Sequence, residues 1–350
     1  MEEIEHFHEM KKKNILIIKP GAIGDLLQLT PVIRALKEKL PAARISLVVG
    51  NSASVDLFRH NPLVHEVIVF DRKGEHRSLT ALAKLWWQLR SSRYDLVLNF
   101  QRSNLKGWLL ATAAFPCWLL VYHKAKGRIV HAVVNHLETL APIGINPLTA
   151  DQRLMFVPGQ EAERFAEEMF EASGFRGKTV VALNPGASFR IKCWLPERLA
   201  ALGERLGNEL GAGVVIVGGG GERDLAEVIC SGMSRPPLDV VGRTNLLQLG
   251  AILQKCTLLV SGDTGPMHMA TAVGTPVLAL FGAIDPDRTG PVGEGHTIIR
   301  HREITCVPCN AKSCGNPRHL ECMEEISVDE VFRTVVEMLA AKNGAMALVP

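Results

Sequence analysis

Short apolar runs that suit β-strands alternate with longer segments that suit helices along almost the whole chain of 350 residues. The predicted strands span residues 14–19, 44–49, 64–70, 95–100, 153–157, 179–183, 213–217, 258–260 and 277–281. The predicted helices follow the first strand as far as residue 40 and then span residues 79–90, 161–173, 196–210, 222–230, 246–254 and 267–273. Such alternation is typical of parallel sheets covered by helices, so the sequence predicts an α/β fold.

The pattern begins again near residues 174–178, after a charged amphipathic segment. A chain of 350 residues is also long for a single domain. We therefore expect two doubly wound domains of similar size, at residues 1–174 and 175–350, with a last helix that could pack back on the first domain. Residues 105–122 show neither a clear strand pattern nor a clear helix pattern.

Composition and charge exclude several classes of protein. Hydrophobic residues make up 47% of the chain and charged residues 21%, which indicates a globular protein. The formal net charge of +3 argues against a nucleic-acid partner held by a broad basic field. The opening MEEIEHFHEMKKK lacks the apolar core of a signal peptide, and the longest uncharged runs, 107–122 and 269–284, each contain a proline and are shorter than a membrane-spanning helix. We expect a soluble, cytoplasmic protein, and contact with a membrane surface stays open.

Polar, glycine-containing loops follow four of the predicted strands. They are KPGAIGD (19–25), NPGASFRIKCW (184–194), VGGGGERD (217–224) and SGDTGPMH (261–268). In open α/β sheets, ligands bind outside the carboxyl ends of the strands. In two domains that face each other, these loops would meet at one cleft.

The first loop offers a carboxylate at the start of a helix. Gly21 and Gly24 allow a close approach of the backbone, but the loop is neither a Walker loop nor GxGxxG, so the nicotinamide fingerprint is missing. Asp25 fits two roles: a first-turn carboxylate that complements the helix dipole, or a general base.

The other loops carry groups that suit a nucleotide sugar, and each has a structural alternative. Ser188, Arg190 and Lys192 suit a diphosphate, or form a solvated basic loop. Thr264 and Gly265 offer donors at a helix start, whereas Asp263 would repel phosphate and so would orient the loop or bind a sugar hydroxyl. His268 could donate to phosphate or ribose or be structural, and Glu222 could hold a ribose diol or complement a helix N-terminus. These last five residues lie in the third and fourth loops.

Three segments carry a resemblance to a known family: GDLLQLTP (24–31), NPGAS with KCW (184–194), and DTGPMHMATAVGTPVLALFG (263–282). Together they resemble the bacterial heptosyltransferases of glycosyltransferase family 9, from about residue 14 to residue 293. The resemblance implies a GT-B fold, in which two Rossmann-like domains face each other across a cleft. It also implies inverting, metal-independent transfer of heptose from ADP-heptose to a lipopolysaccharide core acceptor of the lipid A–Kdo type, without a cofactor.

The resemblance also implies roles for single residues. Asp25 would be the base that takes the acceptor's proton, and Lys192 would support the leaving phosphate. The donor-binding positions would be Gly24, Ser188, Arg190, Glu222, Asp263, Thr264, Gly265 and His268. The first domain would hold the acceptor and the second the nucleotide sugar, at the cytoplasmic face of the inner membrane. Another nucleotide-sugar donor and a nonenzymatic sugar-nucleotide-binding protein remain alternatives.

Two further groups of residues are ambiguous. Cations of the first half could meet a phosphorylated acceptor or belong to a solvated surface; they are Arg102, Lys106, Lys124, Lys126 and Arg128. The four late cysteines, Cys306, Cys309, Cys314 and Cys322, fit reduced thiols or, as the alternative, a structural zinc site. The DPD sequence at 285–287 indicates a turn rather than a metal-binding DxD motif.

Overall fold

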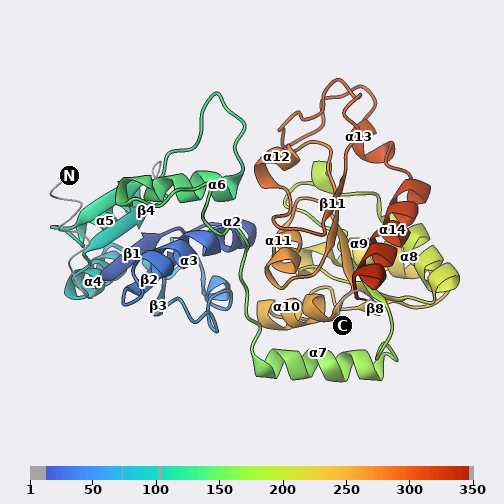
Figure 1. Ribbon diagram of the computed structural model, residues 1–350, viewed down its shortest axis with the longest axis horizontal. Coiled ribbons are helices and arrows are strands. Elements are labelled where there is room, and N and C mark those ends of the chain that lie inside the picture. The colour runs from blue at the N-terminus through green and yellow to red at the C-terminus, as the bar shows by residue number, and fades with distance from the viewer. Residues whose placement is uncertain (1–12, 73, 102–104, 347–350) are drawn as a thin grey trace. The chain divides into compact units, whose positions relative to one another are not determined.

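The computed structural model describes residues 13–72, 74–101 and 105–346, without the side chains of residues 106 and 343–346 (Figure 1). The chain divides into two compact units, Met1–Val157 and Pro158–Pro350, and each is described by itself. This boundary precedes the predicted one at 174/175, because helix α7 (Gln160–Ala172) packs against helix α10 (Leu246–Lys255) and so belongs to the second unit.

The first unit contains a five-stranded parallel sheet. Its strands lie in the order β3 (Glu66–Val69), β2 (Arg44–Val49), β1 (Asn14–Ile18), β4 (Leu96–Asn99) and β5 (Trp118–Val121). The register pairs Ile15 of β1 with Ile45 of β2 and with Leu96 of β4. The strand order reverses direction between β1 and β4, so the carboxyl ends of these two strands flank the switch point where such sheets bind ligands.

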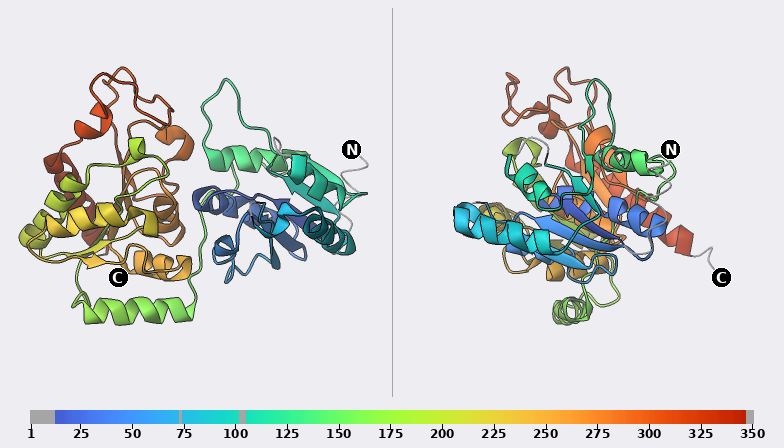
Figure 2. Two further views of the ribbon diagram at one scale, coloured as in Figure 1. Left: turned by 180° about the vertical axis from the view of Figure 1, so that it is seen from behind. Right: turned by 90° about the vertical axis from the view of Figure 1, so that its left-hand side faces the viewer.

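Helices cover both faces of this sheet (Figure 2). They are α2 (Ile23–Leu27), α3 (Thr30–Lys39), α4 (Leu79–Ser91), α5 (Leu105–Thr112) and α6 (Ala132–Leu137), with short 3₁₀ turns at Ser52–Val55, Glu75–Arg77 and Glu138–Ile143. α4 and α5 contact each other and bury Leu85, Leu89 and Leu110 against the sheet, whereas α3 contacts α6. The predicted helix as far as residue 40 is thus two helices, and the uncertain run 105–122 is α5 followed by β5.

The second unit contains a six-stranded parallel sheet. Its strands lie in the order β11 (Thr297–Ile299), β10 (Val277–Leu280), β9 (Leu258–Ser261), β6 (Val180–Leu183), β7 (Gly213–Ile216) and β8 (Leu238–Asp239). This is the Rossmann order, and its switch point lies between β6 and β9. Its other helices are α8 (Pro196–Leu210), α9 (Arg223–Ser231), α11 (Gly265–Ala272), α12 (Pro286–Thr289), α13 (Glu321–Glu324) and α14 (Val328–Met346), with 3₁₀ turns at Arg190–Lys192 and Gly220–Glu222.

Two further expectations can be compared with the structure. The last long helix, α14, packs on α8 and buries Val331 and Val335 in the core of the second unit, because its apolar stripe faces that core. Residues 153–157 run without strand pairing, so the strand predicted there is wrong. In the described part of the chain, no helix has both the length and the apolar character needed to cross a membrane.

Candidate active site

Three of the four predicted loops lie at the switch points of the two sheets, and the fourth, VGGGGERD, follows β7. The KPGAIGD loop follows β1 in the first unit, and the NPGAS and SGDTGPMH loops follow β6 and β9 in the second. Each unit therefore places its polar loops outside the carboxyl ends of its central strands, where parallel α/β sheets bind ligands.

Asp25 is an exposed residue in the first turn of α2. Its side chain lies beside Gly21: a Cβ on that glycine would be 3.1 Å from the Cβ of Asp25 and 3.4 Å from its Oδ2. The same Cβ would be 3.4 Å from Cε of Lys19. Because Gly21 has no side chain, the carboxylate of Asp25 and the side chain of Lys19 can both lie next to it.

Lys19 is buried, which is unusual for a lysine. Its Nζ lies 3.5 Å from Nε2 of His136 and less than 6 Å from the ring centroids of Phe100 and Tyr122. Burial lowers the pKa of Lys19, and the nearby Asp25 carboxylate acts in the opposite direction. We refer to Lys19, Phe100, Tyr122 and His136 as the lysine box.

His136 is the neutral partner in the lysine box. Burial, and secondarily the charge of Lys19, lower the pKa of His136 to about 3. Its Nδ1 lies 3.3 Å from the carbonyl oxygen of Gln28, so the tautomer with hydrogen on Nδ1 donates to Gln28 and leaves Nε2 to accept from Lys19. The lysine box therefore holds the side chain of Lys19 near Asp25 without a direct ion pair between these two residues.

In the second unit, Asn184 joins the two loops at the switch point. Its buried Nδ2 donates to Oγ of Ser261 at 3.0 Å, to Oγ1 of Thr264 at 3.0 Å and to the carbonyl of Gly186 at 3.1 Å. Thr264 is the N-cap of α11 and accepts from the backbone N–H of Met267. The hydroxyl of Thr264 is therefore already engaged in holding the loop.

Lys192 and Asp263 form an ion pair across the same two loops. Their Nζ and Oδ2 atoms are 2.6 Å apart, and the side chains are only 15% and 10% exposed. The other carboxylate oxygen of Asp263 lies 3.9 Å from Nε2 of the buried His268. A Cβ on Gly262 would lie 2.5 Å from the carbonyl oxygen of Lys192, so the loops meet backbone to backbone here. Asp263 thus joins the two loops by holding Lys192.

Glu222 packs against the NPGAS loop. A Cβ on Gly186 would lie 2.0 Å from Cγ of Glu222, so any other residue here would displace the Glu222 side chain from its present position. Ser188 and Arg190, farther along the loop, are exposed. The structure therefore brings together Lys192, Asp263, Thr264, His268 and Glu222 around one switch point, and it leaves Ser188 and Arg190 accessible to a ligand.

The predicted acceptor cations are dispersed. Lys124 and Lys126 are exposed on the segment after β5, and Arg128 pairs with Glu138 at 2.6 Å. Arg102 and the side chain of Lys106 lie outside the described residues. Lys124 and Lys126 remain the described candidates for contact with an acidic acceptor.

The late cysteines are free thiols gathered around α13. Burial and the neighbouring thiols of Cys306, Cys309 and Cys314 raise the pKa of Cys322 to about 11. Within the described residues, however, no three His, Cys, Asp or Glu side chains are spaced to hold a metal ion, so the zinc alternative has no support from geometry. At the DPD sequence, Asp285 caps α12 as a turn residue.

A hollow of about 510 Å³ lies beside α7, away from these loops. Its lining includes Glu167, Phe175 and Lys255, and none of the predicted site residues. The candidate site is therefore assigned from the chemistry and position of the loops, not from the volume of a cavity.

Sequence reasoning missed Asn184 and Ser261 as organisers of the second unit's loops, and Lys19 and His136 as neighbours of Asp25. The role of Asn184 could have been predicted, because a polar residue directly after a buried strand can reach the loop of the neighbouring strand in a parallel sheet. No local signal marks His136, which is 117 residues from Lys19 along the chain.

The chain is similar to several known proteins in sequence and in structure. The sequence matches the family described as "Glycosyltransferase family 9 (heptosyltransferase)" over residues 82–319. It is 27% identical to lipopolysaccharide heptosyltransferase 3 of Escherichia coli K12, over 75% of this chain and 80% of that protein. A family 9 glycosyl transferase of Veillonella parvula has a similar structure (TM-score 0.82, 23% identity, 94% of this chain and 98% of the other). So does E. coli ADP-heptose LPS heptosyltransferase II (TM-score 0.76, 21% identity, 94% and 99%). The structural matches confirm the predicted GT-B fold class.

Proposed function

Because this chain belongs to glycosyltransferase family 9, the heptosyltransferases, we propose that it transfers heptose from ADP-heptose to the inner core of lipopolysaccharide. The observation that carries the proposal is the organised switch point of the second unit, where Lys192, Asp263 and Glu222 surround glycine-containing loops. The names of the similar E. coli proteins supply the donor and the acceptor class. The reaction would take place at the cytoplasmic face of the inner membrane, where a lipid A–Kdo acceptor is anchored.

The proposed chemistry is a single inverting displacement. Asp25 accepts the proton of an acceptor hydroxyl as that oxygen forms a bond to the anomeric carbon of the heptose. The bond between the anomeric carbon and the diphosphate breaks, and ADP leaves with the bonding electron pair. One base and one stabilised leaving group account for all atoms and charges.

Lys192 is the proposed electrostatic partner of the leaving diphosphate. An ammonium group has three N–H donors, and the ion pair with Asp263 uses one of them. The remaining donors can bind phosphate oxygens, and Arg190, which is exposed on the same loop, adds a second cation. These groups provide the positive charge that a divalent metal provides in other transferases, so we expect turnover in the presence of EDTA.

The lysine box sets the electrostatic environment of the base. The side chain of the buried Lys19 lies close to Asp25, on the other side of Gly21. Lys19 is thus a positioning residue for the Asp25 carboxylate.

The decisive variant is Asp25→Asn, which keeps the shape of the side chain and removes its basicity. We expect kcat to fall roughly 100- to 10,000-fold, while calorimetry still detects ADP binding. Glu161→Gln is the matched control, because Glu161 is also an exposed first-turn carboxylate, on α7, outside the candidate loops. Equal activity of the Asp25 and Glu161 variants would reduce Asp25 to a helix-dipole residue. A panel of ADP-, UDP- and GDP-sugars tests the donor, and the anomeric configuration of the product tests inversion.

A further inference from the structure

The charge of this chain is strongly segregated. Residues 76–137 contain nine Lys and Arg but one acidic residue, Asp95. The whole chain has 39 Lys and Arg and 36 Asp and Glu, so the rest of it has 30 basic and 35 acidic residues. The small overall charge of +3 therefore hides one basic segment within an otherwise acidic chain.

The same segment exposes large apolar side chains. On α4, Leu79 is 84% and Trp87 is 67% exposed, and their spacing of eight residues places them on one stripe. On α5, Leu105 is 85% exposed, and Leu109, one turn later, is 42% exposed. Phe115 and Trp118 follow at 43% and 37%. Scattered exposed apolar residues need no explanation, but a cluster on adjacent elements marks a binding surface.

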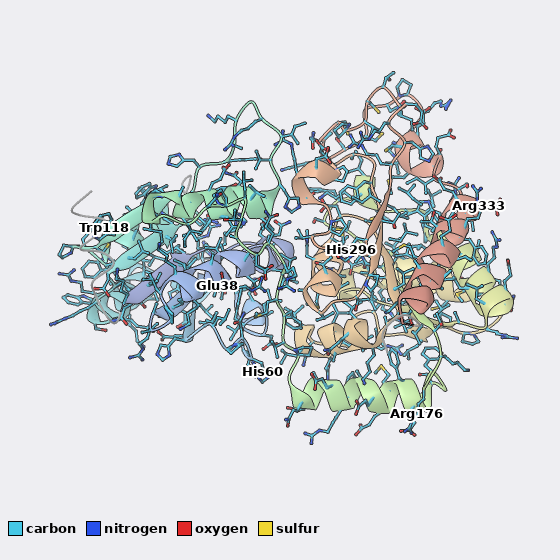
Figure 3. The ribbon with its side chains drawn as sticks, viewed as in Figure 1. Glu38, His60, Trp118, Arg176, His296 and Arg333 are labelled. Carbon is cyan, nitrogen blue, oxygen red and sulfur yellow. The ribbon has the colours of Figure 1, made fainter. Side chains whose placement is uncertain are left out.

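These side chains belong to one continuous face. α4 contacts α5, and Nε1 of Trp86 on α4 donates to Oγ1 of Thr112 on α5 at 3.1 Å. Arg90, at the end of α4, donates to the backbone carbonyl of Phe115. We call the exposed side of α4, α5 and residues 115–118 the α4–α5 face. Figure 3 shows Trp118 at the end of this unit where strand β5 begins.

We propose that the α4–α5 face docks on an anionic membrane surface. Tryptophan and phenylalanine beside leucine suit the boundary between headgroups and acyl chains. The exposed cations Arg77, Lys84 and Arg93 suit anionic headgroups, and α4 and α5 contain no Asp or Glu. A second copy of this chain is the poorer occupant, because a two-fold interface would pair this basic face with an identical basic face.

The topology connects this face with the candidate base. α4 and α5 begin after the carboxyl ends of β3 and β4 and run back along the sheet, so Leu79 and Leu105 lie toward the edge that carries Asp25. A bilayer along the α4–α5 face would therefore extend to the same edge of the sheet. An acceptor anchored in that bilayer would then be presented near Asp25 without leaving its lipid environment.

Co-sedimentation of the full-length protein with lipid vesicles tests the proposal. We expect binding to vesicles of phosphatidylcholine with phosphatidylglycerol, and much weaker binding to phosphatidylcholine alone or at high salt. The variant Arg77→Gln/Lys84→Gln should bind the anionic vesicles about 25-fold more weakly, at about five-fold for each cation. The variant Trp87→Ser/Leu109→Ser should lose about ten-fold or more.

The matched controls are Arg164→Gln, an exposed cation on α7, and Leu148→Ser, an apolar side chain that is 75% exposed elsewhere in the first unit. Both controls should bind as the unaltered chain does, and circular dichroism should show that every variant is folded. Equal binding to neutral and anionic vesicles would overturn the proposal, as would face variants that bind like the controls. A dimer that Trp87→Ser dissociates, without vesicle binding, would identify a second copy as the occupant instead. The vesicles contain no acceptor, so this outcome is separate from the proposed transferase activity.

Discussion

The ion pair between Lys192 and Asp263 gives a prediction whose magnitude follows from its geometry. At 2.6 Å, the attraction between the two charges is about 6 kcal/mol for an effective dielectric constant of about 20. Desolvation of both ions offsets most of that energy. Removing one partner, however, leaves the other charge in a site that is only 10–15% exposed. We therefore expect Asp263→Asn or Lys192→Met to lower the free energy of unfolding of the second unit by about 2 kcal/mol.

The double variant separates stability from catalysis. Lys192→Met with Asp263→Asn removes both charges and keeps similar side-chain volumes, so it should cost about 1–2 kcal/mol rather than the roughly 4 kcal/mol expected by addition. Urea denaturation, monitored by hydrogen exchange of β6 and β9, measures these changes in the free energy of unfolding. The double variant should nevertheless transfer heptose roughly 100- to 1,000-fold more slowly, because the leaving diphosphate loses its proposed partner Lys192 and keeps only the exposed Arg190.

The exposed pair Arg176–Glu171 provides the matched control in the same unit. Its atoms are 3.0 Å apart, but the side chains are 81% and 67% exposed, so its removal should cost no more than about 0.5 kcal/mol. The reasoning is refuted if the Asp263 variant is as stable as the control variants, or if the two single losses simply add. Full activity in the double variant would remove Lys192 from the proposed mechanism.

Three further predictions concern other parts of the structure. Gly262→Ala should lower both stability and kcat, since its Cβ would lie 2.5 Å from a backbone oxygen. Gly207 lies in α8, where an added Cβ would have no neighbour within 4 Å, so Gly207→Ala should stabilise the chain by about 0.5–1 kcal/mol. Thermal melts and initial rates compare the two variants. Because the pKa of His136 is about 3 when folded and ordinarily 6.5, the unfolded chain takes up the proton first. Stability should therefore fall by about 1.4 kcal/mol for each pH unit from 6.5 toward 3, and a His136→Gln variant should lack this slope in acid denaturation. Maleimide followed by mass spectrometry should label the exposed Cys309 first and Cys256 last, since burial raises the pKa of Cys256 to about 12; rapid labelling of Cys256 would contradict its burial.

The sequence predicted those features that depend on local pattern. Apolar runs marked the central strands, and the glycine-containing loops follow the carboxyl ends of strands as expected. Features that depend on distant residues were not predictable. The strand β8 has only two residues, Leu238–Asp239, and it exists because β7 offers it a paired edge. The boundary between the units was placed too late, because an amphipathic pattern shows that α7 needs a partner but not which one.

The candidate site shows the same division between local and distant information. The types of the polar residues indicated a diphosphate, yet their pairing changes the electrostatics of the loops: Lys192 was expected to support a phosphate or to belong to a solvated basic loop, and the structure gives it Asp263 as a partner. Asp263, a carboxylate that would repel phosphate on its own, instead holds the Lys192 ammonium group in place. Likewise, Lys19 follows β1 directly and could have been read as a solvated lysine, but Phe100, Tyr122 and His136 enclose it only because three further elements of the fold converge on the end of β1.

Net charge is the clearest case in which a sum over the sequence conceals its distribution. The value of +3 argued against a nucleic-acid partner held by a broad basic field, yet residues 76–137 alone contain nine basic residues and one acidic residue. Charge acts over about one Debye length, roughly 8–10 Å in physiological salt, so a membrane near α4 responds to Arg77 and Lys84 and not to acidic residues far along the chain. The relevant quantity is therefore the charge of a face together with its exposed apolar side chains, and on the α4–α5 face both favour an anionic bilayer.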